Sequence, residues 1–258
     1  MVSIEAGVLE DVVSDRAGTS EFAWRQSFYL MSLTELTLGA HDLAVVVAAH
    51  PDDESIALGG TISMLLGRGT TVIVVTATDG VASRPGLTGT ALDASKSRRQ
   101  NETRAAIGAL GKGQSGNVLN VQLHLPMGNL AGVETELAEH VHRFLSPRDL
   151  CFSSWEFDGD PDREAAGRAA RSACELSGAR HLQFPVGLWH WASVDDPTLP
   201  WRSARRVSLG VDDTDRKRRA VSCYESQLSV NVEDQCAEVA LPSNELAYFE
   251  RSFEVLFT

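Results

Sequence analysis

The chain has 258 residues, 43% of them hydrophobic, and a formal net charge of −12. Its length and composition allow one large hydrophobic core, in either one domain or two small ones, and no run of about 18 apolar residues exists to cross a bilayer. The acidic balance argues against a surface that binds nucleic acid or an anionic membrane, because such surfaces are basic.

Residues 1–40 are mixed in character and carry early acidic residues. They lack the basic start and apolar run of a secretory signal, so we expect none. A short helix with an aromatic face is expected within residues 20–36, and we interpret residues 1–40 as a segment peripheral to a single domain over residues 41–258. The four cysteines are widely separated without a CxxC pair, which favours reduced thiols and a cytoplasmic location.

From residue 42 onward, the pattern becomes an alternation of strands and helices. Residues 42–49 are a continuous apolar run, typical of a strand buried on both faces of a parallel sheet. Apolar side chains then recur at helical spacing over residues 54–69, and a second buried strand is expected at residues 70–80. A strand, a helix and a strand within about forty residues indicate a right-handed βαβ unit.

The alternation continues through the rest of the chain. We expect strands within residues 117–132, 149–155, 181–193 and 202–210, and helices over residues 97–113, 134–146, 164–178 and 214–228. The pattern predicts one α/β domain, a Rossmann-like three-layer sandwich with a mostly parallel sheet. Ligands of such sheets bind at the carboxyl ends of strands, which is where the sequences HPDDE and WEFDGDPDR lie.

The sequence HPDDE, residues 50–54, follows the first strand. Three adjacent carboxylates at the end of a buried strand repel one another, so a positive charge is expected beside them. An imidazole and carboxylates at this spacing supply a usual ligand set for a zinc-like ion, and one carboxylate can accept the proton of metal-bound water. The alternative is a set of turn and capping acids, with Asp53 or Glu54 favoured by the dipole of the following helix.

The stretch AAHPDDESIALGGTI, residues 48–62, closely resembles the signature of the PIG-L/LmbE-like deacetylases. That zinc-dependent family removes acetyl groups from substrates that contain N-acetylglucosamine, and the likeness runs from about residue 42 to residue 230. The resemblance implies that His50 and Asp53 are metal ligands and that Asp52 is the general base on the metal-bound water.

A second stretch, RRQNETRAAIGALG at residues 98–111, is similar to the family's arginine-x-x-glutamate helix. The resemblance implies that Arg99 contacts the sugar and that Glu102 has a supporting role. The alternative for Arg99 is a solvated helix face.

The second family motif departs from its pattern. Residues 158–170 read DGDPDREAAGRAA, whereas the family reads roughly DGHPDHEAAGRAA. Asp160 replaces the histidine that helps to polarise the acetyl carbonyl, and Arg163 replaces the third zinc ligand. Arginine has no lone pair for a metal, and two like unit charges at about 4 Å repel by about 4 kcal/mol at an effective dielectric constant near 20. Met127 also lies where relatives tend to carry aspartate.

Three interpretations of this departure are open. Asp160 or His190 could supply a substitute ligand, so that a metal still binds. Arg163 could instead pair with Asp52 or Asp53 and replace zinc by an internal salt bridge, in a non-catalytic homologue or a sugar-binding module. The third interpretation is a different metal or an altered reaction on a related substrate.

His190 is flanked by two tryptophans in the sequence GLWHWAS. It could line a sugar pocket, because aromatic faces stack on the apolar face of a pyranose. A buried histidine satisfied by backbone groups is the alternative. The basic run RKRRA at residues 216–220 is best interpreted as a solvated helix face.

Together, these features predict a metal-dependent hydrolase that removes an N-acetyl group from a small molecule containing an amino sugar. Zinc is the expected cofactor, Asp52 and Asp160 are the expected catalytic residues, and Arg99, Arg163 and His190 are expected to bind substrate. The alternative is a catalytically impaired homologue that binds a sugar ligand without zinc. A nucleotide enzyme is disfavoured because no GxGxxG follows the first strand, and neither nucleic-acid binding nor membrane insertion is expected.

Overall fold

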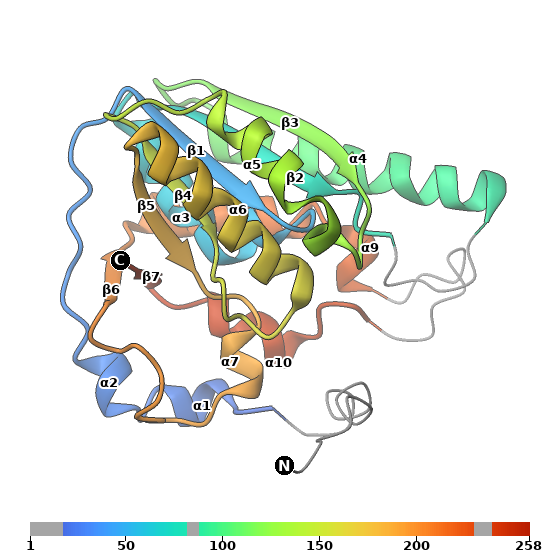
Figure 1. Ribbon diagram of the computed structural model, residues 1–258. Coiled ribbons are helices and arrows are strands. Elements are labelled where there is room, and N and C mark those ends of the chain that lie inside the picture. The colour runs from blue at the N-terminus through green and yellow to red at the C-terminus, as the bar shows by residue number, and fades with distance from the viewer. Residues whose placement is uncertain (1–17, 82–87, 230–238) are drawn as a thin grey trace, which may run out of the picture.

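The computed structural model describes residues 18–81, 88–229 and 239–258, which form a layered α/β structure (Figure 1). A seven-stranded sheet within them has the order β3-β2-β1-β4-β5-β7-β6. In this order the strands are β3 (Val118–Leu125), β2 (Thr71–Thr78), β1 (Leu43–Ala48), β4 (Leu150–Ser154), β5 (Arg180–Phe184), β7 (Phe253–Phe257) and β6 (Ala204–Ser208). The strands from β3 to β5 are parallel, and β7 is antiparallel to both of its neighbours.

Helices cover both faces of the sheet, so the predicted three-layer sandwich with a mostly parallel sheet is confirmed. One apolar core joins the sheet to α3 (Asp53–Gly67), α4 (Gly89–Gly111) and α8 (Val211–Ser222). The other core joins it to α5 (Glu134–His142) and α6 (Pro161–Ser177). Alternate residues of β1 enter the two cores, Val46 on one side and Val47 on the other, which explains why the strand is apolar at every position.

Several elements differ from the sequence-based expectation, among them the helix expected over residues 214–228, which is divided into α8 and the short α9 (Glu225–Leu228). Helix α4 begins at Gly89, earlier than residue 97, and β7 lies in a tail for which no strand was expected. The strand expected over residues 181–193 ends at Phe184, and Leu188–Trp191 form the short helix α7 instead. The buried Asp158 carboxylate accepts the backbone N–H groups of Val186 and Gly187, each at 2.8 Å, so these groups are not available to continue a ladder.

The first described segment packs beside α7 (Figure 1). It contains α1 (Glu21–Trp24) and α2 (Phe28–Met31), in place of the single short helix expected there. Trp24 is fully buried, and its indole Nε1 donates to the Trp189 carbonyl oxygen at 2.7 Å. Glu21 and Arg251 form a buried ion pair that ties the segment to the residues before β7. Residues 1–17, and with them the expected lack of a secretory signal, lie outside the described ranges.

The remaining elements are short. They are η1 (Leu130–Val133), α9 (Glu225–Leu228), α10 (Ser243–Leu246) and η3 (Ala247–Phe249). Across the residues that the structure describes, no helix combines the length and apolarity that a membrane crossing requires.

Candidate active site

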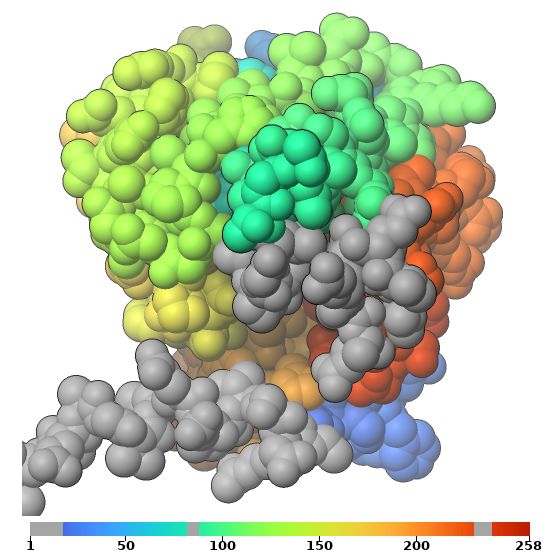
Figure 2. Space-filling model, turned by 90° about the vertical axis from the view of Figure 1, so that its right-hand side faces the viewer, coloured from blue at the N-terminus to red at the C-terminus, as the bar shows by residue number. Residues whose placement is uncertain are grey.

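The two sequence motifs meet at the carboxyl-terminal edge of the sheet. β1 and β4 are parallel neighbours, so the turn after Ala48 and the loop after Ser154 emerge side by side. A pocket of about 200 Å³ lies there, lined by His50, Asp52, Gly80, Arg99, Met127, Asp160, Arg163, Gln227, Ala240 and Leu241. Figure 2 views the face of the molecule that carries the start of α4, in teal. A more apolar pocket of about 310 Å³, along α8, shares no lining residue with it.

Asp52 lies at the N-cap of α3 with φ of 98°, a backbone conformation that non-glycine residues adopt at a cost. Its carboxylate makes no capping hydrogen bond to α3. The side chain is buried, and Arg99 donates from Nη2 to Asp52 Oδ2 at 3.1 Å and to the Pro51 carbonyl oxygen at 2.7 Å. Burial raises the pKa of Asp52 above its ordinary value, although the Arg99 charge opposes the rise. The strained turn therefore holds a buried carboxylate in the pocket wall.

Asp53 is fully buried, and groups of the protein occupy both of its oxygens. Oδ2 accepts the backbone N–H of His50 at 3.0 Å. Oδ1 lies 3.0 Å from Arg163 Nε and 2.9 Å from Arg163 Nη2. The expected metal ligand Asp53 is thus paired with the arginine that replaces another expected ligand.

Arg163 reaches this position from the first turn of α6. Asp160 caps that helix by accepting the Arg163 backbone N–H at 2.9 Å, and Pro161 follows at the first helical position. Helical side chains lean toward the N-terminus, which directs Arg163 back to the strand ends. Its Nη1 is 3.9 Å from Asp158 Oδ2. Burial lowers the pKa of Arg163, but the neighbouring carboxylates outweigh it and hold the pKa above its usual value.

His50 lies between β2 and the start of α6. Its Nδ1 is 3.1 Å from Thr78 Oγ1, and its Nε2 is 3.5 Å from Asp160 Oδ1. Burial lowers the pKa of His50, but the Asp160 hydrogen bond and the Asp53 charge outweigh burial and raise it overall. Burial alone would raise the pKa of Asp160, but the His50 hydrogen bond and the Arg163 charge outweigh burial and hold this pKa below its usual range. Asp160 is therefore an acceptor here and does not replace the hydrogen-bond donor of the family motif.

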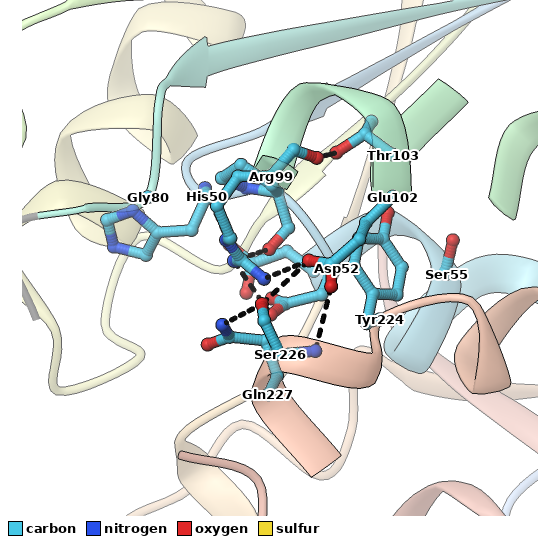
Figure 3. A network of polar contacts seen from close by, with 12 residues as sticks. His50, Asp52, Ser55, Gly80, Arg99, Glu102, Thr103, Tyr224, Ser226 and Gln227 are labelled. Carbon is cyan, nitrogen blue, oxygen red and sulfur yellow. Dashed lines mark hydrogen bonds and ion pairs between the residues drawn. The ribbon is translucent and has the colours of Figure 1, made fainter. Parts of the chain in front are cut away.

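A second group of polar contacts supports Asp52 from behind (Figure 3). Arg99 Nη1 is 3.7 Å from Glu102 Oε2, and Glu102 accepts the backbone N–H of Ser226 at 2.7 Å and its hydroxyl at 2.8 Å. The Arg99 guanidinium also lies 5.7 Å from the centre of the Tyr224 ring. Glu102 thus joins α4 to Ser226 of α9, a geometry consistent with the supporting role expected for it.

Glu54 does not face the pocket. Its carboxylate accepts the Tyr224 hydroxyl, the Ser55 hydroxyl and the Asp52 backbone N–H. Burial raises the pKa of Glu54 to about 7, and the Tyr224 hydrogen bond opposes the rise. The alternative that the acids of HPDDE cap the following helix holds for Glu54, which accepts a backbone N–H at the start of α3. Asp52 and Asp53 instead pair with the two arginines.

Most of the expected site residues come together here, and one does not. His50, Asp52, Arg99, Asp160 and Arg163 line the pocket, and Asp53 lies directly behind them. In contrast, His190 lies in α7, where its carbonyl oxygen accepts the Thr19 N–H at 3.0 Å and its Nδ1 is 3.7 Å from Glu245 Oε1. It is not among the pocket-lining residues.

Sequence reasoning missed several residues of this region. Gln227 and Leu241 line the pocket, Tyr224 and Ser226 support it, and Asp158 organises the loop after β5. The signal for Asp158 was present in DGDPD, next to the two substituted positions. The polar sequence YESQ at residues 224–227, directly after a basic helix, was the signal for the others.

The arrangement does not fit a resident zinc ion. The expected ligands are His50, Asp53 and the side chain at position 163, and the last is a guanidinium that holds Asp53 Oδ1 through two nitrogens. The Arg163 guanidinium has no lone pair with which to ligate a metal, and its positive charge repels a dication beside Asp53. In the described part of the chain, no group of three or more His, Cys, Asp or Glu side chains is placed to hold a metal ion.

Solved structures confirm the fold. The chain is 25% identical to the conserved protein TT1542 from Thermus thermophilus, with a TM-score of 0.53 over 75% of this chain and 82% of that one. The A40926 pseudoaglycone deacetylase Dbv21 has a TM-score of 0.59 at 17% identity, covering 84% of this chain and 96% of its own. For the zinc-inhibited form of teicoplanin deacetylase Orf2 the TM-score is 0.56 at 17% identity, covering 83% and 97%.

A search of curated proteins finds no match to this sequence. A family model does match, over residues 45–174, which include both motifs and half of the chain. With the shared fold and the strand-end pocket, this match shows that the chain belongs to the PIG-L family, described as GlcNAc-PI de-N-acetylase.

Proposed function

We propose that this chain is an N-deacetylase that acts on a small molecule containing an N-acetylated amino sugar. The observation that carries the proposal is that Asp52 lines the strand-end pocket; the resemblance of its motif to the family signature implies that this carboxylate is the general base. The deacetylases among the structural neighbours support the same reaction class by their fold. The substrate class rests on the family resemblance.

The pocket lining suits a carbohydrate. Asp160, Arg163 and Gln227 offer charged and amide groups that can bind hydroxyls, and Met127 and Leu241 offer apolar surface for a ring face. A volume of about 200 Å³ favours a single ring in the pocket, with the rest of the substrate outside it.

Residues of the chain supply the polar groups for amide hydrolysis. Asp52 takes a proton from an attacking water, whose oxygen forms a bond to the acetyl carbon. The carbon–nitrogen bond then breaks, the nitrogen takes up a proton, and acetate and a free amine leave. Arg163 is a cationic group of the pocket lining that can donate a hydrogen bond to the acetyl oxygen as charge develops there. Arg99 keeps Asp52 in place through its 3.1 Å contact.

A second candidate function is binding of the same sugar ligand without turnover. The pairing of Arg163 with Asp53 favours it, because the metal position of the family motif is taken by an internal cation. A hydrolase that lacks the family's metal chemistry must activate the attacking water through Asp52 and stabilise the oxyanion through cationic groups of the pocket such as Arg163.

The two candidates differ in amine release. Purified protein is incubated with a panel of N-acetylglucosamine conjugates, the free amine is measured with an amine-reactive fluorophore, and binding is measured by calorimetry. For a deacetylase we expect amine release that falls at least 100-fold in Asp52→Asn and is unchanged in Asp93→Asn, which alters an exposed residue of α4. Binding without amine release in the wild type supports the second candidate, and neither binding nor release from any conjugate contradicts both.

We also propose a cytoplasmic location. Cys151, Cys174 and Cys223 are free thiols, as is usual in reducing compartments, and Cys236 lies outside the described residues. Fractionation of the source cells should recover the protein with cytosolic markers, and recovery in a secreted or membrane fraction would contradict this location.

A further inference from the structure

The start of α6 places a guanidinium where the family motif places a metal ligand. Asp160 caps the helix, Pro161 begins it, and Arg163 extends from the third helical position into the acidic cluster. The register is fixed on both sides of the substitution, because the matching pairs DG and PD precede Arg163 and the sequence EAAGRAA follows it. The arginine therefore occupies the ligand position itself and not a neighbouring one.

The contacts of Arg163 are those of a cation that neutralises the cluster. Asp53 is fully buried, and one of its oxygens receives both Nε and Nη2 of Arg163 at 3.0 and 2.9 Å. Asp158, also fully buried, lies 3.9 Å from Nη1. Buried carboxylates require a compensating positive charge, and here the chain supplies it from within.

The same contacts leave the family ligand set incomplete. His50 directs Nδ1 to Thr78 and Nε2 to Asp160, and Asp53 is engaged by Arg163. A dication entering between them would have to displace a positive group that cannot lose its proton. The charge requirement of the acidic motif is already satisfied.

From these observations we propose that the Arg163 guanidinium permanently replaces the metal ion, so that this member of the family folds and binds its ligand without a divalent cation. The inference rests on the proposed function only in taking this pocket as the working site. The inference concerns metal binding and does not depend on which reaction occurs. Zinc binding could therefore disprove the inference while deacetylation is observed, and deacetylation could be absent while the inference holds.

The test is metal content. Protein purified without a chelator is incubated with equimolar zinc, passed over a desalting column and analysed by mass spectrometry for metal, and thermal unfolding is followed with and without EDTA. We expect the wild type to retain less than about a tenth of an equivalent of zinc and to show the same Tm in EDTA. One equivalent of zinc in the wild type, or a Tm that falls in EDTA, would overturn the proposal, and this arm depends on no variant.

A reversion tests whether position 163 is the reason. The substitution Arg163→His adds an imidazole beside His50 and Asp53, and we expect close to one equivalent of zinc and a Tm that EDTA lowers. In the double variant His50→Ala/Arg163→His the gained zinc should be lost again. Arg168→His is the matched control, because Arg168 lies on the same helix, is partly exposed and pairs with Glu134 outside the pocket. Zinc uptake by the control equal to that of Arg163→His, or none by a folded Arg163→His protein, would overturn the assignment.

Amine release is measured on the same samples. Wild-type deacetylation that is unchanged by EDTA supports both the proposed function and metal independence. If the wild type releases no amine and binds no zinc, the proposed deacetylase function is contradicted, and the proposal that Arg163 replaces the metal ion is supported.

Discussion

The turn after β1 and the first turn of α6 reach the same pocket with opposite charges. The turn carries Asp52 and Asp53 in a sequence that follows the family pattern, whereas α6 carries Arg163 where the family has a histidine. The acidic turn has kept its form although its counter-charge now comes from a neighbouring helix. The difference teaches that an intact HPDDE sequence indicates the need for a positive charge, and that the second motif decides which cation provides it.

The two carboxylates of the turn also differ from each other. Asp52 pairs with Arg99 from α4, and Asp53 pairs with Arg163 from α6. Asp52 and Arg99 both line the pocket, whereas only Arg163 of the second pair does, because the fully buried Asp53 lies behind it. Substitutions in each ion pair distinguish their contributions to stability.

The largest effect is expected from breaking the Asp53–Arg163 pair. Asp53→Asn leaves the Arg163 charge without its main partner in a buried place, so we expect a loss of about 3–5 kcal/mol in the free energy of unfolding. Urea unfolding followed by circular dichroism measures the loss. The control Asp212→Asn, on the exposed face of α8, should stay within about 0.5 kcal/mol. Equal small losses in both variants would show that the pair is not required for stability.

Removing both partners should cost less than the sum of the single losses. We expect Asp53→Leu/Arg163→Met to recover at least about 2 kcal/mol relative to the sum of the two single variants, because neither charge is then left unpaired. The comparison requires all four proteins of the cycle in the same urea series. Additive losses would indicate that the two side chains act independently.

A smaller loss is expected at the other pair. Arg99→Met removes the partner of Asp52, but burial already raises the pKa of Asp52, so this carboxyl can become neutral when the arginine is absent. We expect a loss of about 2–3 kcal/mol in unfolding free energy at pH 7, below that of Asp53→Asn. A loss larger than that of Asp53→Asn would reverse the ranking of the two pairs.

Away from the pocket, His181 of β5 should give a pH dependence independent of both pairs. Burial lowers the pKa of His181 to about 4, and Arg171 adds to this. As the pH falls, His181 takes up a proton in the unfolded chain near pH 6.5, before it does so in the folded protein. The contribution of His181 to the free energy of unfolding is therefore fully present above about pH 6.5 and is lost as the pH drops toward 4. We expect His181→Gln to flatten this fall by roughly 1–2 kcal/mol, because the ring is partly exposed. An unchanged pH profile of unfolding would contradict the shift.

The smallest effect is expected on the solvated face of α8. Arg218 and Asp215 form an ion pair whose side chains are 60% and 48% exposed. Arg218→Ala should change the unfolding free energy by no more than about 0.5 kcal/mol, since solvent screens such pairs. A larger loss would show that Arg218 contacts more than solvent, as Lys217 of the same basic run does: it is buried and pairs with Glu254 at 2.7 Å, so the expected solvated face holds for only part of residues 216–220.

The fold was predictable where the pattern is strong and local. The apolar run of β1 and the helical spacing of α3 have clear periods, and the alternation of elements indicated a parallel sheet. Two local errors have physical causes. The aromatic run in α7 has no clear period, and β7 is placed by pairing with β5 and β6, which no local pattern reveals.

The candidate site was predictable to the extent that its residues lie in two short motifs. His50, Asp52 and Asp53 share one turn, and the substitution of Arg163 was visible in the register. The contact of Tyr224 with Glu54 was not predictable, because the two residues are 170 positions apart and meet only when α8 packs on α3. The sequence alone left open which carboxylate Arg163 meets, and the side-chain distances identify Asp53.

The position of β7 between β5 and β6 also bears on how the chain is made. Among the described strands, β6 pairs with the sheet through β7, although β6 is synthesised some fifty residues earlier. Until Phe253–Phe257 leave the ribosome, β5 and β6 both present unpaired backbone, which invites association with other nascent chains. A translation product that stops short of β7 would therefore keep unpaired strand edges, which favour aggregation.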